Sequence, residues 1–247
     1  MAILRFENVG LQKPDGVGGY VKILEGITLD IEKGEIFAFA GPSGSGKSSM
    51  LRLINRLDDC TDGKVLFDDV PLAEWDIVKL RQRVGFMFQE AALFEGTVRE
   101  NVLFGPCLHG LRRCDEQKTA LNLLERVGLS QKLLNRSVDA LSGGQKQRVN
   151  LARTLALDPE IVLMDEPTSS LDPASARVVE TLAVSLNKQE GKTVIMVSHD
   201  LKQIENIAHR CAVLNKGKLR FVGTPDELKH NQETLKLLME GEEGGDL

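Results

Sequence analysis

One glycine-rich segment constrains the fold of this chain more than any other feature of its 247 residues. Residues 41–48 read Gly-Pro-Ser-Gly-Ser-Gly-Lys-Ser, which fits the pattern G-x-x-x-x-G-K-[ST]. An apolar run at 35–40 precedes the segment, and an amphipathic stretch over 47–56 follows it. This order predicts a strand, a tight loop and a helix. Such a loop aims backbone N–H groups and the positive end of a helix dipole at phosphate oxygens.

Two side chains of this segment have specific expected roles. Lys47 is expected to reach the β- and γ-phosphates of a nucleotide, and the Ser48 hydroxyl to take one position on Mg²⁺. The flanking strand and helix supply the context that the motif requires. The expected nucleotide contacts are Gly41, Pro42, Ser43, Gly44, Ser45, Gly46, Lys47, Ser48 and Ser49.

Two acidic residues follow a second apolar run. Residues 161–164 predict a buried strand, and Asp165 and Glu166 come directly after it. Ligands of open α/β sheets bind at the carboxyl ends of the strands, so both acids are expected beside the nucleotide. Asp165 is expected to hold magnesium through water, and Glu166 to polarise an attacking water molecule.

The remaining pattern predicts an α/β fold. Residues 3–9 and 27–32 alternate apolar and polar side chains, as half-buried antiparallel strands do. Residues 91–158 are rich in Leu, Ala, Arg and Glu and predict an inserted group of helices. We therefore expect a P-loop NTPase core with a mostly parallel sheet, an N-terminal antiparallel β subdomain and an inserted α-helical subdomain.

The second half of the chain supports the parallel sheet. A helix expected over 174–188 separates the strand at 161–164 from a strand at 193–197, and strand, helix and strand in that order form a βαβ unit. We expect one domain over residues 1–240. The glycine- and acid-rich residues 241–247 are expected to form a disordered tail.

Composition argues against several classes of protein. Lys plus Arg number 31 and Asp plus Glu 36, so the net charge of −5 does not favour nucleic acid as a partner. The cysteines Cys60, Cys107, Cys114 and Cys211 form no C-x-x-C pair and are expected to be reduced, small core residues in a cytosolic compartment. No apolar run approaches the roughly 20 residues of a membrane span, so any span is expected in a separate chain.

A second glycine pair identifies a family. Residues 141–145 read Leu-Ser-Gly-Gly-Gln before an expected helix, where Ser142 can cap the helix and the glycines allow an anion to approach closely. With the segment at 41–48, Gln89, the run Met-Asp-Glu-Pro-Thr-Ser-Ser-Leu-Asp at 164–172 and Val-Ser-His-Asp at 197–200, the chain resembles the nucleotide-binding subunits of ATP-binding cassette transporters over residues 3–230.

This resemblance implies a homodimer of cassettes packed head to tail. ATP then lies between the P-loop of one chain and Ser142, Gly143, Gly144 and Gln145 of the other. By the same resemblance Gln89 touches magnesium and reports to the membrane partner, His199 contacts the γ-phosphate, and Asp172 links the two sites across the dimer. From the residues alone, Asp172 could equally be a helix cap before Pro173.

The chain departs from the family pattern at the adenine. Members usually stack adenine on an aromatic residue near the N-terminus, and Lys13 stands at that position here. Tyr20 lies in the same loop and is the candidate substitute; the alternative is that adenine has no stacking partner. Phe6 and Phe37 are expected to face the core instead.

The resemblance implies an ATPase that powers a transporter from the cytoplasmic face of a membrane, bound to a separate transmembrane permease subunit. The alternative is a soluble cassette ATPase in assembly or maintenance. Residues 93–102 resemble the corresponding segment of exporter cassettes, which favours export of a metal or small solute. Within that region Phe94, Val98, Val102, Leu103 and Phe104 are expected to offer an apolar surface to the permease, with Phe94 the most exposed.

Overall fold

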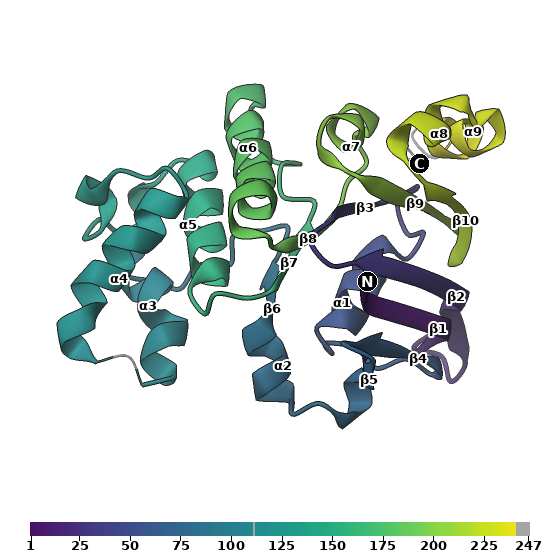
Figure 1. The fold of residues 1–247 in the computed structure, drawn as a ribbon, viewed down its shortest axis with the longest axis horizontal. Helices are drawn as coiled ribbons and strands as arrows, with labels where there is room; N and C mark the ends of the chain where they lie inside the picture. Colours follow the sequence, from purple (N-terminus) through teal and green to yellow (C-terminus); the bar gives the residue numbers. More distant parts are fainter. Residues whose placement is uncertain (111, 241–247) are drawn as a thin grey trace.

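The computed structural model describes residues 1–110 and 112–240. Two β-sheets and a group of helices make up the fold (Figure 1). The expected α/β class is confirmed, with the antiparallel sheet at the N-terminus and the mostly parallel sheet after it. Residues 241–247, which are expected to form a disordered tail, lie outside the described residues.

The N-terminal sheet has the strand order β2-β1-β4-β5, and its neighbouring strands are antiparallel. Its strands are β1 (Ala2–Pro14), β2 (Tyr20–Glu32), β4 (Asp62–Phe67) and β5 (Val70–Pro71). Strands β1 and β2 extend well beyond the predicted ranges. Shifts of register after Phe6 and Val9, with Asn8 at φ 50°, interrupt the alternation of apolar and polar residues that marks a strand in the sequence.

The larger sheet has the order β10-β9-β3-β8-β7-β6. Its strands are parallel except for the β9–β10 hairpin. They are β3 (Ile36–Ala40), β6 (Val84–Met87), β7 (Ile161–Asp165), β8 (Thr193–Val197), β9 (Arg210–Asn215) and β10 (Lys218–Gly223). The carboxyl ends of β3, β7 and β8 therefore meet at one edge, where a ligand is expected.

The helices cover both faces of this sheet. The α-helices are α1 (Lys47–Ile54), α2 (Ile77–Arg83), α3 (Val98–Leu108), α4 (Arg113–Arg126), α5 (Gly143–Leu155), α6 (Pro173–Glu190), α7 (Leu201–Ile207), α8 (Pro225–His230) and α9 (Gln232–Glu240). The sequence analysis missed α2, α7 and α9. The first two have only seven residues each, too few for a clear helical period.

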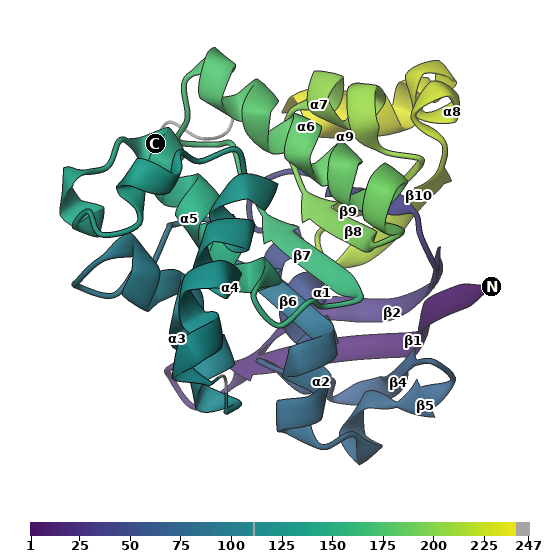
Figure 2. The same ribbon diagram turned by 60° about the vertical axis from the view of Figure 1, so that its left-hand side comes forward.

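Strand β3 shows how one short segment serves two cores. All five of its residues are buried, and successive side chains point to opposite faces. Phe37 and Phe39 pack with α1 in the core between the two sheets, whereas Ile36 and Ala38 pack under the helices on the other face. Helix α1 is thus enclosed between the sheets, as Figures 1 and 2 show. This burial rigidly holds the loop that leads from β3 into α1.

Helices α3, α4 and α5 gather beyond the β6 edge of the sheet, at the left of Figure 1. Helix α3 begins with a capping box, in which Thr97 accepts from the N–H of Glu100 and the Glu100 carboxylate accepts from the N–H of Thr97. The predicted insertion of helices is therefore present. Whether residues 1–240 form one domain stays a prediction.

The cysteines differ in their exposure to solvent. Cys211 is buried, but Cys107 and Cys114 are exposed, so the expectation that the cysteines are core residues is wrong for these two. Helix α3 turns Cys107 away from the apolar face that packs on α5.

None of the helices in residues 1–110 and 112–240 has the length and apolar character needed to cross a bilayer.

Candidate functional site

The loop between β3 and α1 has the shape that a phosphate cradle requires. Gly41 has φ 144°, and a Cβ there would lie 2.1 Å from the carbonyl oxygen of Leu214. Gly46 has φ 104°, and a Cβ there would press on Leu24. A Cβ at Gly44, in contrast, would meet only open space. Two of the glycines are therefore needed for packing and backbone conformation, while the loop stays open to a ligand at Gly44.

Lys47 is buried within this loop. Its ammonium group donates to the carbonyl oxygens of Gly41 and Pro42 at 2.8 Å each, which uses two of its three N–H groups. Burial lowers the pKa of Lys47, and the nearby carboxylates of Glu166 and Asp165 act in the opposite direction. An anion at the loop would give the desolvated charge a partner, as expected for a phosphate ligand.

Ser48 and Asp165 lie opposite each other at the ends of α1 and β7. The Ser48 hydroxyl donates to Oδ1 of Asp165 at 2.9 Å, which brings together two oxygen ligands of the kind that Mg²⁺ prefers. These two residues therefore fit a magnesium site. Gln89, the third predicted ligand, contacts Glu166 and not this pair.

The ionised side chain of Asp165 should lower the free energy of unfolding of the free protein. Burial raises its pKa, although the bond from Ser48 acts in the opposite direction. A raised carboxyl pKa means that ionisation disfavours folding above that pKa, and that the penalty is relieved as the pH falls through it. We expect Asp165→Asn, which keeps an acceptor for Ser48, to raise the thermal midpoint at pH 7 by about 2–4 °C.

Thermal unfolding without nucleotide or Mg²⁺ measures this effect. Asp172→Asn is the control, because hydrogen bonds from Ser175 and neighbouring backbone N–H groups lower the pKa of Asp172. That variant should not raise the midpoint. An unchanged or lower midpoint in Asp165→Asn would show that the buried carboxylate carries no penalty.

Glu166 stands one residue beyond the end of β7 in a strained conformation. Its φ is 42°, a left-handed value that costs a residue other than glycine of the order of 1 kcal/mol. Its Oε2 accepts from the Gln89 amide at 3.0 Å and lies 3.7 Å from Nδ1 of His199. The structure thus brings three predicted site residues together, from segments that are far apart in the sequence.

The Leu-Ser-Gly-Gly-Gln segment begins α5. Ser142 accepts from the N–H of Gln145 and the Gln145 side chain accepts from the N–H of Ser142, so the predicted helix cap is confirmed. Gly144 is required by packing, since a Cβ there would lie 2.6 Å from Oγ of Ser175. Gly143 meets nothing nearer than 4.0 Å, so the face that it presents is open.

Asp172 caps α6 within the same chain. Its Oδ1 accepts from the N–H groups of Ala174 and Ser175, with Pro173 as the first residue of the helix. The structure therefore supports the alternative that the sequence left open. Its predicted role across a dimer is not visible in one chain and stays a prediction.

Tyr20 lies away from the phosphate loop. It is 72% exposed at the start of β2, where it pairs with Pro14, and the part of β2 that contacts Gly46 is Ile23–Leu24. Lys13 donates to Asp58 at 2.8 Å. Stacking of adenine on Tyr20 therefore stays a prediction. Phe6 and Phe37 are fully buried, as expected.

The comparisons with known proteins agree with this geometry. The family model described as "ABC transporter" matches residues 24–169. The chain is 44% identical over 209 residues to ABC transporter I family member 17 of Arabidopsis thaliana, covering 85% of this chain and 79% of that protein. The chain belongs to the ABC transporter family. It is an ATPase cassette of that family.

Other relatives and a solved structure define the likeness further. Protein STAR1 of Oryza sativa subsp. japonica is 45% identical, with 84% of this chain and 59% of that protein covered. Methionine import ATP-binding protein MetN of Clostridioides difficile is 40% identical, over 91% of this chain and 71% of that protein. The dimeric cassette MJ0796, in a post-hydrolysis state with ADP and Pi, has a TM-score of 0.82 and 33% identity, over 90% of this chain and 98% of that one.

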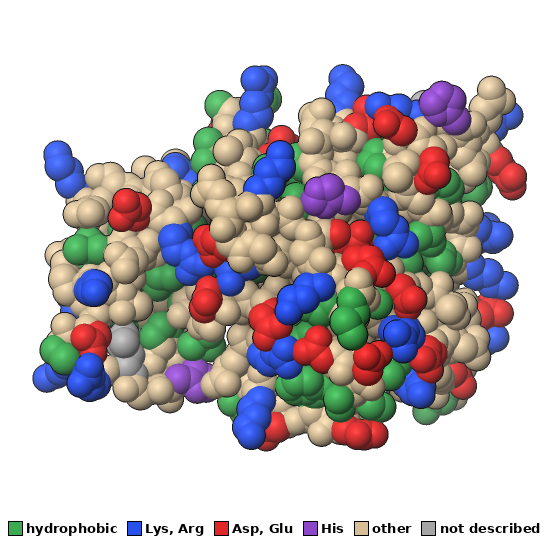
Figure 3. Space-filling model, in the orientation of Figure 1, with side chains coloured by type: hydrophobic (Ala, Val, Ile, Leu, Met, Phe, Trp, Pro, Cys, Tyr) green, Lys and Arg blue, Asp and Glu red, His purple; other side chains and the backbone are tan. Residues whose placement is uncertain are grey.

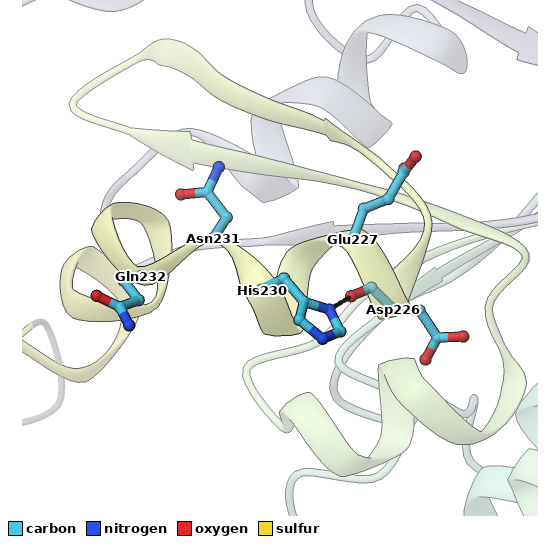
Figure 4. Close-up of a pocket in the computed structure, with 5 residues that line it drawn as sticks. All are labelled: Asp226, Glu227, His230, Asn231 and Gln232. Atoms are coloured by element: carbon cyan, nitrogen blue, oxygen red, sulfur yellow. Dashed lines mark hydrogen bonds between the residues drawn. The ribbon is translucent and has the colours of Figure 1, made fainter.

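Two hollows of the cassette differ in size and in the residues that line them. A hollow of about 350 Å³ lies at the P-loop, lined by residues 42–45 with Asn215, Lys216 and Leu237. A larger, open hollow of about 680 Å³ lies at the junction of α8 and α9. Figure 4 shows that its side chains point in different directions, with the His230 ring bonded to the backbone oxygen of Asp226. The P-loop hollow is the better candidate for the nucleotide.

The sequence analysis missed several residues that shape the site. Gln147 and Asn150 of α5 are buried and donate to backbone oxygens of Gln89 and Phe88. The available signal was their polar character on a helix that also buries Val149 and Leu151. A single polar residue beside apolar neighbours could not show which loop it contacts.

Proposed function

We propose that two copies of this cassette bind ATP head to tail, with the nucleotide between the P-loop of one copy and the Leu-Ser-Gly-Gly-Gln segment of the other. The open surfaces at Gly44 and Gly143 support this arrangement, because both face away from the core of their own chain. The dimeric state of the cassette MJ0796 gives it independent support.

Within each site we assign hydrolysis to Glu166, with Gln89 and His199 as its neighbours. Lys47 binds the phosphates, and Ser48 and Asp165 hold Mg²⁺, which when bound neutralises negative charge on the phosphate oxygens. Glu166 then orients and polarises the attacking water. The observation that carries this assignment is the convergence of Gln89, Glu166 and His199 at the carboxyl ends of β6, β7 and β8.

Phosphate release by the purified cassette tests the assignment. We expect turnover that requires Mg²⁺ and stops when the metal is chelated with EDTA. Turnover of equal rate in EDTA would contradict the roles of Ser48 and Asp165.

The face drawn in Figure 3 carries Lys and Arg side chains interspersed with Asp and Glu. The expected absence of a nucleic-acid partner stays a prediction.

We propose further that the cassette works with a separate transmembrane permease on the cytoplasmic face of a membrane. The supporting observation is an exposed aromatic pair, Phe94 and Phe104, which are 49% and 47% exposed with ring centroids 4.7 Å apart. A hollow of about 420 Å³ beside Phe104 extends this apolar area along α3.

The predicted docking surface is only partly correct. Val98, Val102 and Leu103 are buried and belong to the core between α3 and α5. They lie on the inner face of α3, and the sequence did not show which side of this helix faces the protein. Phe94 is exposed, as expected.

Phe94→Asp should weaken binding of the permease while leaving the nucleotide site intact. A charge opposite an apolar helix is desolvated without a partner, so we expect at least about a 30-fold loss of affinity. Co-purification with the permease measures the loss, and ATP affinity of the free cassette should stay within about twofold.

Val78→Asp is the matched control. Val78 is also an exposed apolar residue, but it lies on α2 and belongs neither to the aromatic pair nor to the hollow along α3. This variant should keep permease binding. If Phe94→Asp loses ATP binding or unfolds while its permease contact is retained, Phe94 belongs to the core and the docking assignment is wrong.

The names of the relatives bear on the direction and the substrate of transport. The likeness of residues 93–102 to exporter cassettes favoured export of a metal or small solute, but none of the relatives described above is named as an exporter. The one relative above whose name gives a direction, MetN, is an importer of methionine. We therefore propose import of a small organic solute. Uptake of candidate solutes by vesicles that contain the permease and the cassette tests this.

A further inference from the structure

The loop that carries Gln89 is fastened to one side of the molecule. This glutamine loop, residues 88–97, joins β6 to α3 and has no helix or strand of its own. Three of its backbone carbonyl oxygens accept from side chains of α5. Gln147 donates to Gln89 O at 2.6 Å, Asn150 to Phe88 O at 3.3 Å and Arg153 to Ala92 O at 2.8 Å.

The three donors form one stripe along α5. Their spacing of three residues places them on the same side of the helix. Gln147 is 3% exposed and Asn150 is 1% exposed, and Arg153 also donates to the Asn150 side chain at 3.1 Å. Water cannot readily replace the bonds of the two buried amides, Gln147 and Asn150, so the loop and α5 are expected to move together.

On its other side the loop contacts the catalytic centre through one side chain. The Gln89 amide donates to Glu166 at 3.0 Å and to Oγ of Ser169 at 3.3 Å. Helix α3 holds the next part of the loop, because the Asn101 side chain exchanges hydrogen bonds with the backbone of Phe94. The backbone of the loop thus belongs to the helices, while the Gln89 side chain reaches the strand ends.

Gln147 bonds the same residue that contacts Glu166. We propose that Gln147 is a positioning residue that links the Leu-Ser-Gly-Gly-Gln end of α5 to Glu166 through Gln89. A shift of α5, caused by an anion bound at Gly143 and Gly144, would displace Gln89 and so change its contact with Glu166. This proposal rests on the proposed head-to-tail dimer and deepens it. When the Leu-Ser-Gly-Gly-Gln segment of one cassette binds the ATP of the other, the contacts of Glu166 in the first cassette would change.

Gln147→Met removes the donor at nearly constant volume. We expect kcat for ATP with Mg²⁺ to fall about tenfold, with KM within about twofold, since Gln147 touches no part of the phosphate loop. Asn187→Leu is the matched control. Asn187 is also a buried amide, which donates to the backbone oxygens of Gly34 and Lys192, so its loss should lower stability but leave kcat near wild type.

A double-mutant cycle separates positioning from a general loss of structure. If Gln147 acts through Gln89, then Gln147→Met should have no further effect on kcat in a Gln89→Ala background. Effects that multiply would overturn the proposal. A kcat in Gln147→Met equal to that of wild type would overturn it as well.

Hydrogen exchange at the loop gives a readout that needs no activity. The backbone N–H of Phe94 is bonded to Asn101, and we expect it to exchange at least about tenfold faster in Gln147→Met and at the wild-type rate in Asn187→Leu. Unchanged exchange in Gln147→Met would refute the link between α5 and the loop. If wild type itself failed to hydrolyse ATP, the proposed function would fail, and faster exchange would still support the link to Gln89.

Discussion

Glu166→Gln should lower ATP turnover by roughly 10²–10⁴-fold while ATP stays bound, because removing a general base has an effect of this size. The amide keeps the size of the carboxylate and still accepts from Gln89, so the site should retain its geometry. It cannot, however, take a proton from water. Phosphate release measures turnover, and equilibrium binding of ATP measures the retained affinity.

The same variant should make the ATP-bound dimer easier to isolate. Without ATP the phosphate-facing loops leave polar groups unmatched, which disfavours closure, and the chain should be monomeric or weakly dimeric. Light scattering of Glu166→Gln with and without ATP tests this. Normal turnover in Glu166→Gln would refute the general-base assignment, and a tight dimer without nucleotide would contradict the role of ATP in closure.

Lys47→Ala should weaken ATP binding by roughly 30-fold or more. The substitution removes a charge-assisted hydrogen bond worth about 2 kcal/mol to the phosphates. The free protein should tolerate the change, since burial disfavours the Lys47 charge when no anion is bound. Titration of the purified chain with ATP measures the loss.

Lys216→Ala is the control for this experiment. Lys216 lines the same hollow as the P-loop, but its side chain is exposed at the β9–β10 turn. Its removal should change ATP affinity by only a small factor, because an exposed charge is well screened. Equal losses in the two variants would show that Lys47 acts as a general positive charge and not as a phosphate ligand.

The parts of the site that are local in sequence could be predicted from the sequence. The P-loop is one continuous segment, and its strand and helix have apolar periods that show where they are buried. Asp165 and Glu166 directly follow an apolar strand. Ser142 caps the helix that begins at the next residue. In each case neighbours along the chain are also neighbours in space.

The parts that depend on long-range contacts could not. The left-handed conformation of Glu166 is stabilised by packing around it, including the bond from its N–H to the carbonyl oxygen of Val197. The burial of Val98, and the exposure of Phe104 on the same helix, depend on where α5 packs. Gln147 has a role only because α5 lies against the loop at Gln89.

The sequence by itself determined the α/β class, the phosphate loop and the family, because these follow from short motifs and from the period of apolar residues. Only the tertiary structure decided which side of α3 is exposed and which residues meet Glu166. A helical period shows that a face is buried but not what covers it, and hydrogen bonds between distant segments leave no periodic trace in the chain. The order of motifs thus established the chemistry, and the packing of α5 on the loop established how its parts are connected.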